Sequence, residues 1–273
     1  MRRRRYAINT PTMDQKLTTS EGLYNLSRIG VDHRDVSIGN VLLGTDPEKV
    51  AGFISDLDLS SISEEAIKAA RPNDYDTIIM QMKTGEWRTV CDYHLEAPCT
   101  NCSYDLSAQG TALFMAGGLL TALRTIGRPR NRPTMRMSDF TFQHRLCHDF
   151  ESLLWVVVYA MMIHRRNDLA ATDPELLEEY KKDLDECWAA HAYSNLLRSH
   201  TFMISIGCSF DSQSIVSSWF PDSREAAFFR EAMRMLRDQT QDGEPITYEV
   251  LCALFEKHIQ LAKEPQTLDI VSK

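Results

Sequence analysis

The sequence predicts a mainly α-helical fold with a small β-hairpin, and three observations support this fold class. Apolar residues recur at helical spacing in several segments. The run from Leu153 to Ile163 is apolar on every face of a helix, as expected for a central helix surrounded by others. Two short apolar runs between residues 41 and 55 flank a turn-forming sequence, which is typical of a hairpin.

A helix followed by the hairpin is expected in the N-terminal part of the chain. Apolar residues at roughly helical spacing predict a helix from Lys16 to Ile29, and Gly30 then provides a stop signal. The strands of the hairpin are Val41–Leu43 and Val50–Ser55, with the turn at Gly44–Pro47. A loop with polar side chains therefore lies between the predicted helix and the hairpin.

The middle of the chain combines a long polar segment with the central helix. Residues 59–109 show little clean periodicity, which predicts a long loop with one short helix from Ser63 to Ala70. A loop of this length is usually functional or disordered. At Asp149 the pattern changes and leads into the apolar run Leu153–Ile163, so the central helix is expected to begin at Asp149.

Three more helices are expected in the C-terminal part. Asp173 and Pro174 form a cap and first-turn pair in front of an amphipathic helix that reaches Trp188. Two further amphipathic segments, Ser223–Gln239 and Thr247–Gln260, predict the last two helices.

Composition and charge exclude several function classes. The 273 residues are 43% hydrophobic and 25% charged with a net charge of -8, so nucleic acid and anionic membranes are not expected partners. The longest apolar run is shorter than the roughly 18 residues that span a bilayer. The seven cysteines do not suggest a disulfide framework, and the sequence shows no secretory signal pattern. Both observations favour an intracellular protein of the cytoplasm or nucleus. The basic run Met1–Arg5 is short, and a solvated terminus is expected there rather than a nuclear targeting signal.

A set of polar residues around the predicted hairpin carries the chemistry. His33, Arg34 and Asp35 are followed after four residues by Asn40, and Asp56 stands at the end of an apolar strand sixteen residues later. Phosphoryl transfer needs metal held on carboxylate and amide oxygens to neutralise the moving phosphoryl group. It also needs a carboxylate that orients the attacking hydroxyl and accepts its proton. This spacing therefore indicates a phosphotransfer site.

The stretch HRDVSIGN with its following strand and Asp56 resembles the catalytic loop and metal-binding segment of protein kinases. GTALFMA at Gly110–Ala116 resembles the substrate-docking end of a kinase activation segment, and HDFES from His148 resembles the start of the kinase central helix. The fungal-type protein kinases are the most similar family. The residues that carry this resemblance are Ser37, Asp56-Leu57-Asp58, Gly110-Thr111, Phe114-Met115-Ala116, Asp149 and Glu151-Ser152.

The resemblance implies a role for each matched residue. It makes Asp35 the catalytic base, with Arg34 and Asn40 as the other catalytic-loop residues, and it implies ATP and Mg²⁺ as cofactors. The implied Mg²⁺ and nucleotide ligands are Asn40 and Asp56. Thr111 would position Asp35, and Asp149 would brace the loop backbone near His33 and Arg34.

The same resemblance implies the organisation of the chain. A helical kinase C-lobe is expected over residues 16–262, between a basic tail (1–15) and a C-terminal tail (263–273). Within the lobe lie the catalytic loop 33–40, the metal segment 56–58, the activation segment 59–118 and the central helix 149–164.

Several positions depart from the ordinary kinase pattern. Ser37 replaces the Lys that contacts the transferred phosphate in serine/threonine kinases, and Asp58 replaces a glycine. Only 32 residues precede His33, and they contain no glycine-rich loop and no Lys within an apolar strand. The expectation is therefore an incomplete kinase domain without the nucleotide-covering lobe, explained by an incomplete or deleted gene, a pseudokinase, or an unusual active enzyme.

Three functions remain open from the sequence. The first is a serine/threonine protein kinase that acts on a protein substrate of unspecified identity. The second is a small-molecule phosphotransferase of the aminoglycoside or choline kinase type, which shares the catalytic pattern but has no use for a peptide-docking segment. The third is a non-catalytic interaction module that needs neither Asp35 nor Asp56 for binding.

Other polar residues carry weaker hypotheses. A possible Zn²⁺ array consists of Cys91, His94, Cys99 and Cys102. Its central spacing is shorter than in common zinc modules, so Zn²⁺ is not expected. His144 and His148 precede the central helix and are expected to be packing or capping residues.

Overall fold

The computed structural model describes residues 13–43, 52–57, 60–70, 113–126, 144–188 and 193–263. Its helices are α1 (Met13–Arg28), α2 (Glu64–Ala70), α6 (Gly117–Ile126), α7 (Leu146–Thr172), α8 (Pro174–Trp188), α9 (Tyr193–Cys208), α10 (Gln213–Trp219), α11 (Ser223–Asp242) and α12 (Tyr248–Lys263). Its strands are β1 (Val31–Asp32), β2 (Val41–Leu43), β3 (Gly52–Ile54) and β4 (Ser61–Ile62). The described fold is therefore mainly helical.

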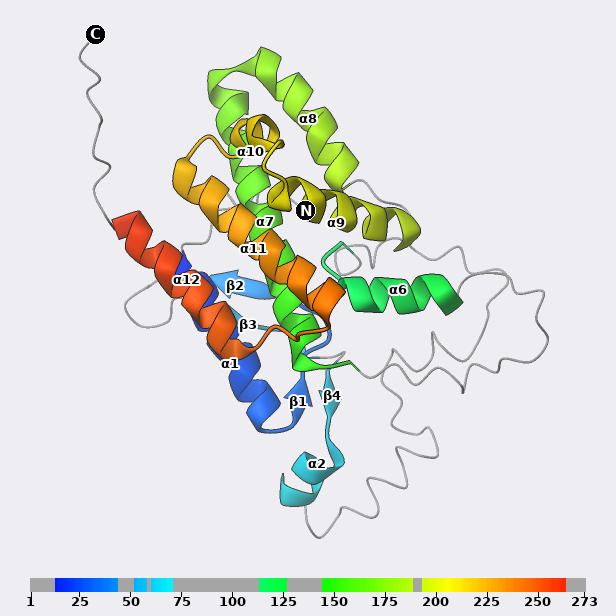
Figure 1. Cartoon of the computed structure of the whole chain (residues 1–273). Helices are drawn as coiled ribbons and strands as arrows, with labels where there is room; N and C mark the ends of the chain where they lie inside the picture. The colour runs from blue at the N-terminus through cyan, green and yellow to red at the C-terminus, as the bar shows by residue number, and fades with distance from the viewer. Residues whose placement is uncertain are drawn as a thin grey trace, which may run out of the picture.

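Helix α7 is the centre of the core. It runs through the middle of the molecule, with α11 crossing in front of it and α1 and α12 side by side below (Figure 1). Phe150, Leu153, Leu154 and Trp155 are completely buried. The helix is long and apolar enough to cross a membrane by composition, but 78% of its most apolar window is buried against the rest of the protein. Its all-round apolar sequence is thus explained by a central position.

The surrounding helices attach to α7 and to one another through aromatic side chains with polar tips. The hydroxyl group of Tyr180 on α8 donates to the Met162 carbonyl oxygen on α7 at 3.1 Å. Tyr24 on α1 stacks on Tyr248 of α12, with ring centroids 4.1 Å apart. Aromatic rings bury a large apolar area, so these contacts pack α8 against α7 and α1 against α12.

Two small antiparallel sheets position the loop between β1 and β2. In one sheet Val41 pairs with Ile54, and in the other Val31 pairs with Ile62. Gly30 has a φ of 78°, and a Cβ atom there would collide with Ser63 Oγ. Glycine is therefore required at the turn that leads from α1 into β1.

The predicted hairpin is confirmed by the β2–β3 pair, and the predicted helix after Ser63 is confirmed as α2. The first helix begins at Met13 rather than Lys16, and the central helix extends over Leu146–Thr172 rather than 149–164. The extension at the C-terminal end is mostly exposed and has one buried apolar side chain, Leu169, so its sequence lacks the apolar periodicity that would predict a helix.

Helices α6, α9 and α10 and the β1–β4 pair were not expected from the sequence. Helix α6 begins with two glycines, which are poor helix formers. Helix α9 contains Gly207 at its close contact with α11. The strands β1 and β4 have two residues each, too few to show alternation. Tertiary packing therefore determines these elements.

Gly207→Ala is expected to destabilise the protein. The added Cβ atom would collide with Met233 Cβ and Cγ and lie 3.2 Å from Phe229. Overpacking of this kind costs ~1–3 kcal/mol, which exceeds the gain from placing alanine in a helix. The measurement is the urea midpoint of unfolding. Gly118→Ala, at an exposed position of α6 where an added Cβ atom would meet no atom closer than 3.7 Å, is the control and should not lower the midpoint. Equal midpoints for both variants would contradict this packing.

Candidate functional site

The loop from His33 to Asn40 is closed by its own hydrogen bonds. The Asn40 side-chain amide donates from Nδ2 to the Asp35 carbonyl oxygen at 2.9 Å. The backbone N–H groups of Asn40 and Val41 both donate to the Ser37 carbonyl oxygen at 3.0 Å. Because its Nδ2 is occupied in this way, Asn40 presents its side-chain oxygen as the atom available to a ligand.

His33 joins this loop to the end of β3. The ring is buried, with Nδ1 3.2 Å from the Asp35 backbone nitrogen and Nε2 2.9 Å from the Ser55 carbonyl oxygen. A backbone N–H only donates and a carbonyl only accepts, so His33 is in the Nε2–H tautomer. The Ser55 N–H in turn donates to the Asn40 carbonyl oxygen at 2.8 Å. Asp56, which follows Ser55, is therefore held beside Asn40.

Two residues of this cluster have left-handed backbone conformations. Arg34 has a φ of 69° and Asp56 a φ of 65°, and no other non-glycine residue has a positive φ within the described ranges. Such conformations cost on the order of 1 kcal/mol or more each, and they persist only where surrounding contacts hold them. Their concentration in one small cluster indicates a functional site.

Asp149, near the start of α7, provides contacts that hold the loop backbone. Its Oδ2 accepts from the His33 N–H at 3.1 Å, and its Oδ1 accepts from the Arg34 N–H at 3.0 Å. His144 Nε2 lies 2.9 Å from the same Oδ1. The carboxylate is 1% exposed. One buried side chain therefore binds two successive N–H groups, which explains how Arg34 keeps its left-handed conformation.

Charges around Asp149 affect the neighbouring titratable groups. Burial raises the pKa of Asp32, and the negative charge of Asp149 raises it further, while His144 and Arg34 act in the opposite direction. Burial lowers the pKa of His148 to about 4, assisted by the nearby His144. His148 is therefore neutral at physiological pH, and its Nδ1 accepts from the Arg145 N–H at 2.9 Å, which caps α7.

Asp35 is the polar side chain in the loop that the protein leaves unsatisfied. It is 7% exposed, and its Oδ1 is buried without a hydrogen-bond partner among the residues that the structure describes. Buried polar atoms of native proteins are nearly always paired, so an exception calls for an explanation. An acceptor oxygen for which the described part of the chain offers no donor suits a hydroxyl group from outside.

The structure thus brings His33, Arg34, Asp35, Asn40 and Asp149 into one hydrogen-bonded cluster, with Asp56 at its edge. Thr111, Asp58 and the Cys91–Cys102 array lie outside the described residues. The same holds for the activation segment 59–118 apart from residues 60–70 and 113–118. Within the described ranges, no group of three or more His, Cys, Asp or Glu side chains is arranged to hold a metal ion.

His144 is the member of the cluster that sequence reasoning missed. Packing or capping was expected for both histidines before α7, and His148 does cap the helix. His144 instead contacts the carboxylate that holds the backbone of the loop 33–40. No sequence pattern marks this contact, so only the fold reveals it.

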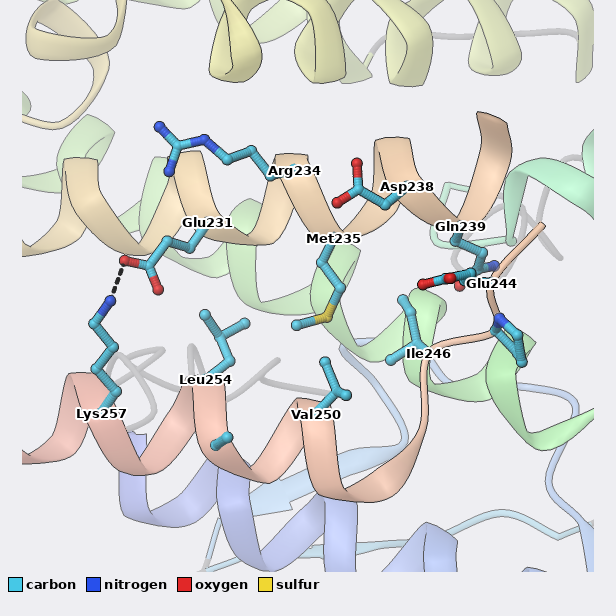
Figure 2. Close-up of a pocket in the computed structure, with 12 residues that line it drawn as sticks. Glu231, Arg234, Met235, Asp238, Gln239, Glu244, Ile246, Val250, Leu254 and Lys257 are labelled. Carbon is cyan, nitrogen blue, oxygen red and sulfur yellow. Dashed lines mark hydrogen bonds and ion pairs between the residues drawn. The ribbon is translucent and has the colours of Figure 1, made fainter. Parts of the chain in front are cut away.

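A groove elsewhere on the molecule lies between α11 and α12 (Figure 2). Apolar side chains form its floor, and charged or polar side chains stand at its ends. Figure 2 shows the floor residues Met235, Ile246, Val250 and Leu254, the Glu231–Lys257 ion pair at one end, and Gln239 and Glu244 at the other. None of its lining residues belongs to the loop 33–40, so it is separate from the cluster around Asp35.

The mainly helical fold, with its small strand pairs and hydrogen-bonded loop, is consistent with a kinase-like helical lobe, and the comparison with known families gives the class of protein. A family model described as fungal protein kinase matches residues 19–161, slightly more than half of the 273 residues. The chain belongs to the fungal protein kinase family. No curated protein matches the chain. No solved structure matches it either.

Asp149→Asn is expected to destabilise the protein by ~2–4 kcal/mol. The substitution replaces one of the two acceptor oxygens with an NH₂ group, so one of the backbone N–H groups of His33 and Arg34 loses its acceptor. Equilibrium denaturation measures the loss. Asp168→Asn is the matched control on the same helix, since that side chain is 51% exposed and should change stability by less than ~0.5 kcal/mol. Equal effects of the two substitutions would refute the bracing role of Asp149.

Asp32→Asn is expected to stabilise the protein at pH 7. The pKa of Asp32 is raised in the folded state, so the folded protein loses stability as the pH rises from the unfolded value near 3.8 through the folded value. The substitution removes this loss, and its benefit should vanish below pH 3.8. Thermal unfolding followed from pH 3 to 8 measures the difference from the unmodified protein. A benefit that grows towards low pH would contradict the assignment.

Proposed function

We propose that the chain is a protein kinase domain in which Asp35 is the catalytic base for transfer of the ATP γ-phosphate to a protein hydroxyl group. The observation that carries the proposal is the buried Oδ1 of Asp35, which has no hydrogen-bond partner within the described ranges. A general base must be within hydrogen-bond reach of the proton that it takes, so an unoccupied acceptor at a fixed position suits this role.

The surrounding contacts support the positioning of Asp35. Its backbone N–H donates to His33, and its backbone carbonyl accepts from Asn40. The backbone of the two preceding residues is held by Asp149. The contacts of Asp149 start from the buried core helix α7, and those of His33 and Asn40 lie within the loop, so the backbone that carries Asp35 is fixed before a substrate arrives. Such preorganisation supplies a large part of the rate in phosphoryl transfer.

Asn40 and Asp56 fit the oxygen ligands that Mg²⁺ prefers. Asn40 presents its side-chain oxygen because its Nδ2 is bound to the Asp35 carbonyl. Asp56 has an exposed carboxylate and follows Ser55, whose N–H donates to the Asn40 carbonyl oxygen. Mg²⁺ is usually held by one or two protein oxygens together with water and substrate phosphates. When bound, the ion would neutralise charge on the ATP phosphates. The two side chains would hold and orient that complex beside Asp35.

A protein rather than a small molecule is the proposed acceptor. The segment that resembles a substrate-docking element is anchored in the structure at residues 113–117, with Phe114 and Ala116 buried against the core. A small-molecule phosphotransferase has no need for such an element. A serine or threonine hydroxyl is the proposed group, in keeping with the family resemblance.

The test is phosphate transfer from radiolabelled ATP with Mg²⁺ to casein, a protein rich in serine. Asp35→Asn should lower the rate by roughly 10²- to 10⁴-fold, because it removes a positioned general base. The stability of this variant should not fall, since the substitution removes a buried carboxylate whose Oδ1 has no partner.

Asp185→Asn is the matched control, because this side chain is exposed on α8, and it should retain full activity. Undiminished transfer by Asp35→Asn would exclude the assignment. Transfer to an aminoglycoside or to choline, but not to casein, would favour the small-molecule class. No transfer at all by the unmodified chain would favour a non-catalytic interaction module.

A further inference from the structure

Residues 113–117, here called the docking segment, are held at both ends by side chains of other helices. The Gly117 N–H donates to Glu151 Oε1 of α7 at 2.8 Å. His200 Nε2 of α9 lies 3.1 Å from the Leu113 carbonyl oxygen. Between these points Phe114 is 1% exposed and Ala116 is fully buried. The main chain of the segment is therefore tied down by hydrogen bonds and by two buried side chains.

Glu151 collects donors from three parts of the chain. Its Oε1 accepts from Gly117 and from Trp155 Nε1 at 3.3 Å, and its Oε2 accepts from Gln239 Nε2 of α11 at 2.8 Å. Burial raises the pKa of this 4%-exposed carboxyl group, and the three donors lower it. Burying a carboxylate has an unfavourable desolvation free energy. The contribution of Glu151 is therefore the fixed positions of its hydrogen-bond partners rather than stability.

His200 acts as the second anchor in a defined protonation state. Its ring stacks on Trp155 with centroids 3.9 Å apart, and burial lowers its pKa to about 4. A carbonyl oxygen only accepts, so the neutral ring must donate to Leu113 from Nε2. Its Nδ1 is then a buried acceptor without a partner. The ring orientation is thus set by Leu113 and Trp155 together.

The carboxylates of Asp149 and Glu151 lie on the same turn of α7 and contact two different segments of the chain. Residues two apart on a helix project in directions roughly 200° apart. Asp149 contacts the loop 33–40, and Glu151 contacts the docking segment. Because α7 is a buried and rigid element, the loop and the segment are placed relative to each other through a single helix.

We propose that Glu151 and His200 are positioning residues that hold the docking segment in the conformation that receives the protein acceptor next to Asp35. The proposal rests on the proposed kinase function for its catalytic consequence. The anchoring of the segment itself can be measured without any activity, so the two can fail separately.

The kinetic test compares Glu151→Ala with Glu151→Gln. Alanine removes the acceptor for Gly117, whereas glutamine keeps one acceptor oxygen. Its NH₂ group can donate to Gln239 Oε1 once the Gln239 amide, whose Nε2 now faces Glu151, turns over. Glu151→Ala should raise KM for casein roughly 10-fold or more, as expected for a lost charge-assisted hydrogen bond. KM for ATP and ATP hydrolysis without acceptor should stay within about twofold, and Glu151→Gln should restore most of the casein KM.

The activity-independent test is amide hydrogen exchange of residues 113–118. Glu151→Ala and His200→Phe, which keeps a ring against Trp155, should each speed exchange in this segment roughly 10-fold or more. Exchange in residues 33–40 should not change. Controls are Glu178→Ala and His164→Phe, at exposed positions on α8 and α7, which should match the unmodified chain.

Each outcome bears on one of the two proposals. Faster exchange confined to the segment, in a chain that does not phosphorylate casein, supports the anchoring and overturns the kinase function. Unchanged exchange in both variants overturns the anchoring. An equal increase of amide exchange over the whole chain indicates a general stabilising role and also overturns the anchoring. A parallel rise of KM for ATP and KM for casein has the same meaning.

Discussion

The two hydrogen bonds from the His33 and Arg34 backbone to the Asp149 carboxylate are the contacts on which the site depends. They join a strained loop to the buried central helix α7. Of the described hydrogen bonds in the loop, the one from the Arg34 N–H to Asp149 acts directly on the residue with the left-handed conformation. Because Asp35 is the next residue, its direction follows from the same constraint.

Helix α7 combines the roles of core and scaffold. Its apolar surface packs against helices on several sides, which makes the helix rigid, and its first turns carry the polar side chains Asp149 and Glu151. A buried carboxylate is stable only when donors surround it, and both side chains have them. The result is that two segments distant in sequence are placed by one element that cannot easily move.

The site also shows where the protein gives up stability. Within the described ranges Asp35 keeps a buried oxygen without a partner, and Arg34 and Asp56 hold uncommon backbone conformations. The supporting carboxylates of Asp149 and Glu151, in contrast, accept hydrogen bonds from within the protein. This division is expected when a few side chains are reserved for ligands and the surrounding contacts hold them in position.

The sequence by itself determined the helical class, the hairpin and the positions of the loop residues, because each of these depends on neighbours close in the chain. HRDVSIGN is contiguous, and α7 shows its burial in its own composition. Only the tertiary structure decided that His144 contacts Asp149, that Gln239 reaches Glu151 and that His200 holds Leu113. The last two pairs are 88 and 87 residues apart, and local patterns carry no information about which distant surfaces will pack together.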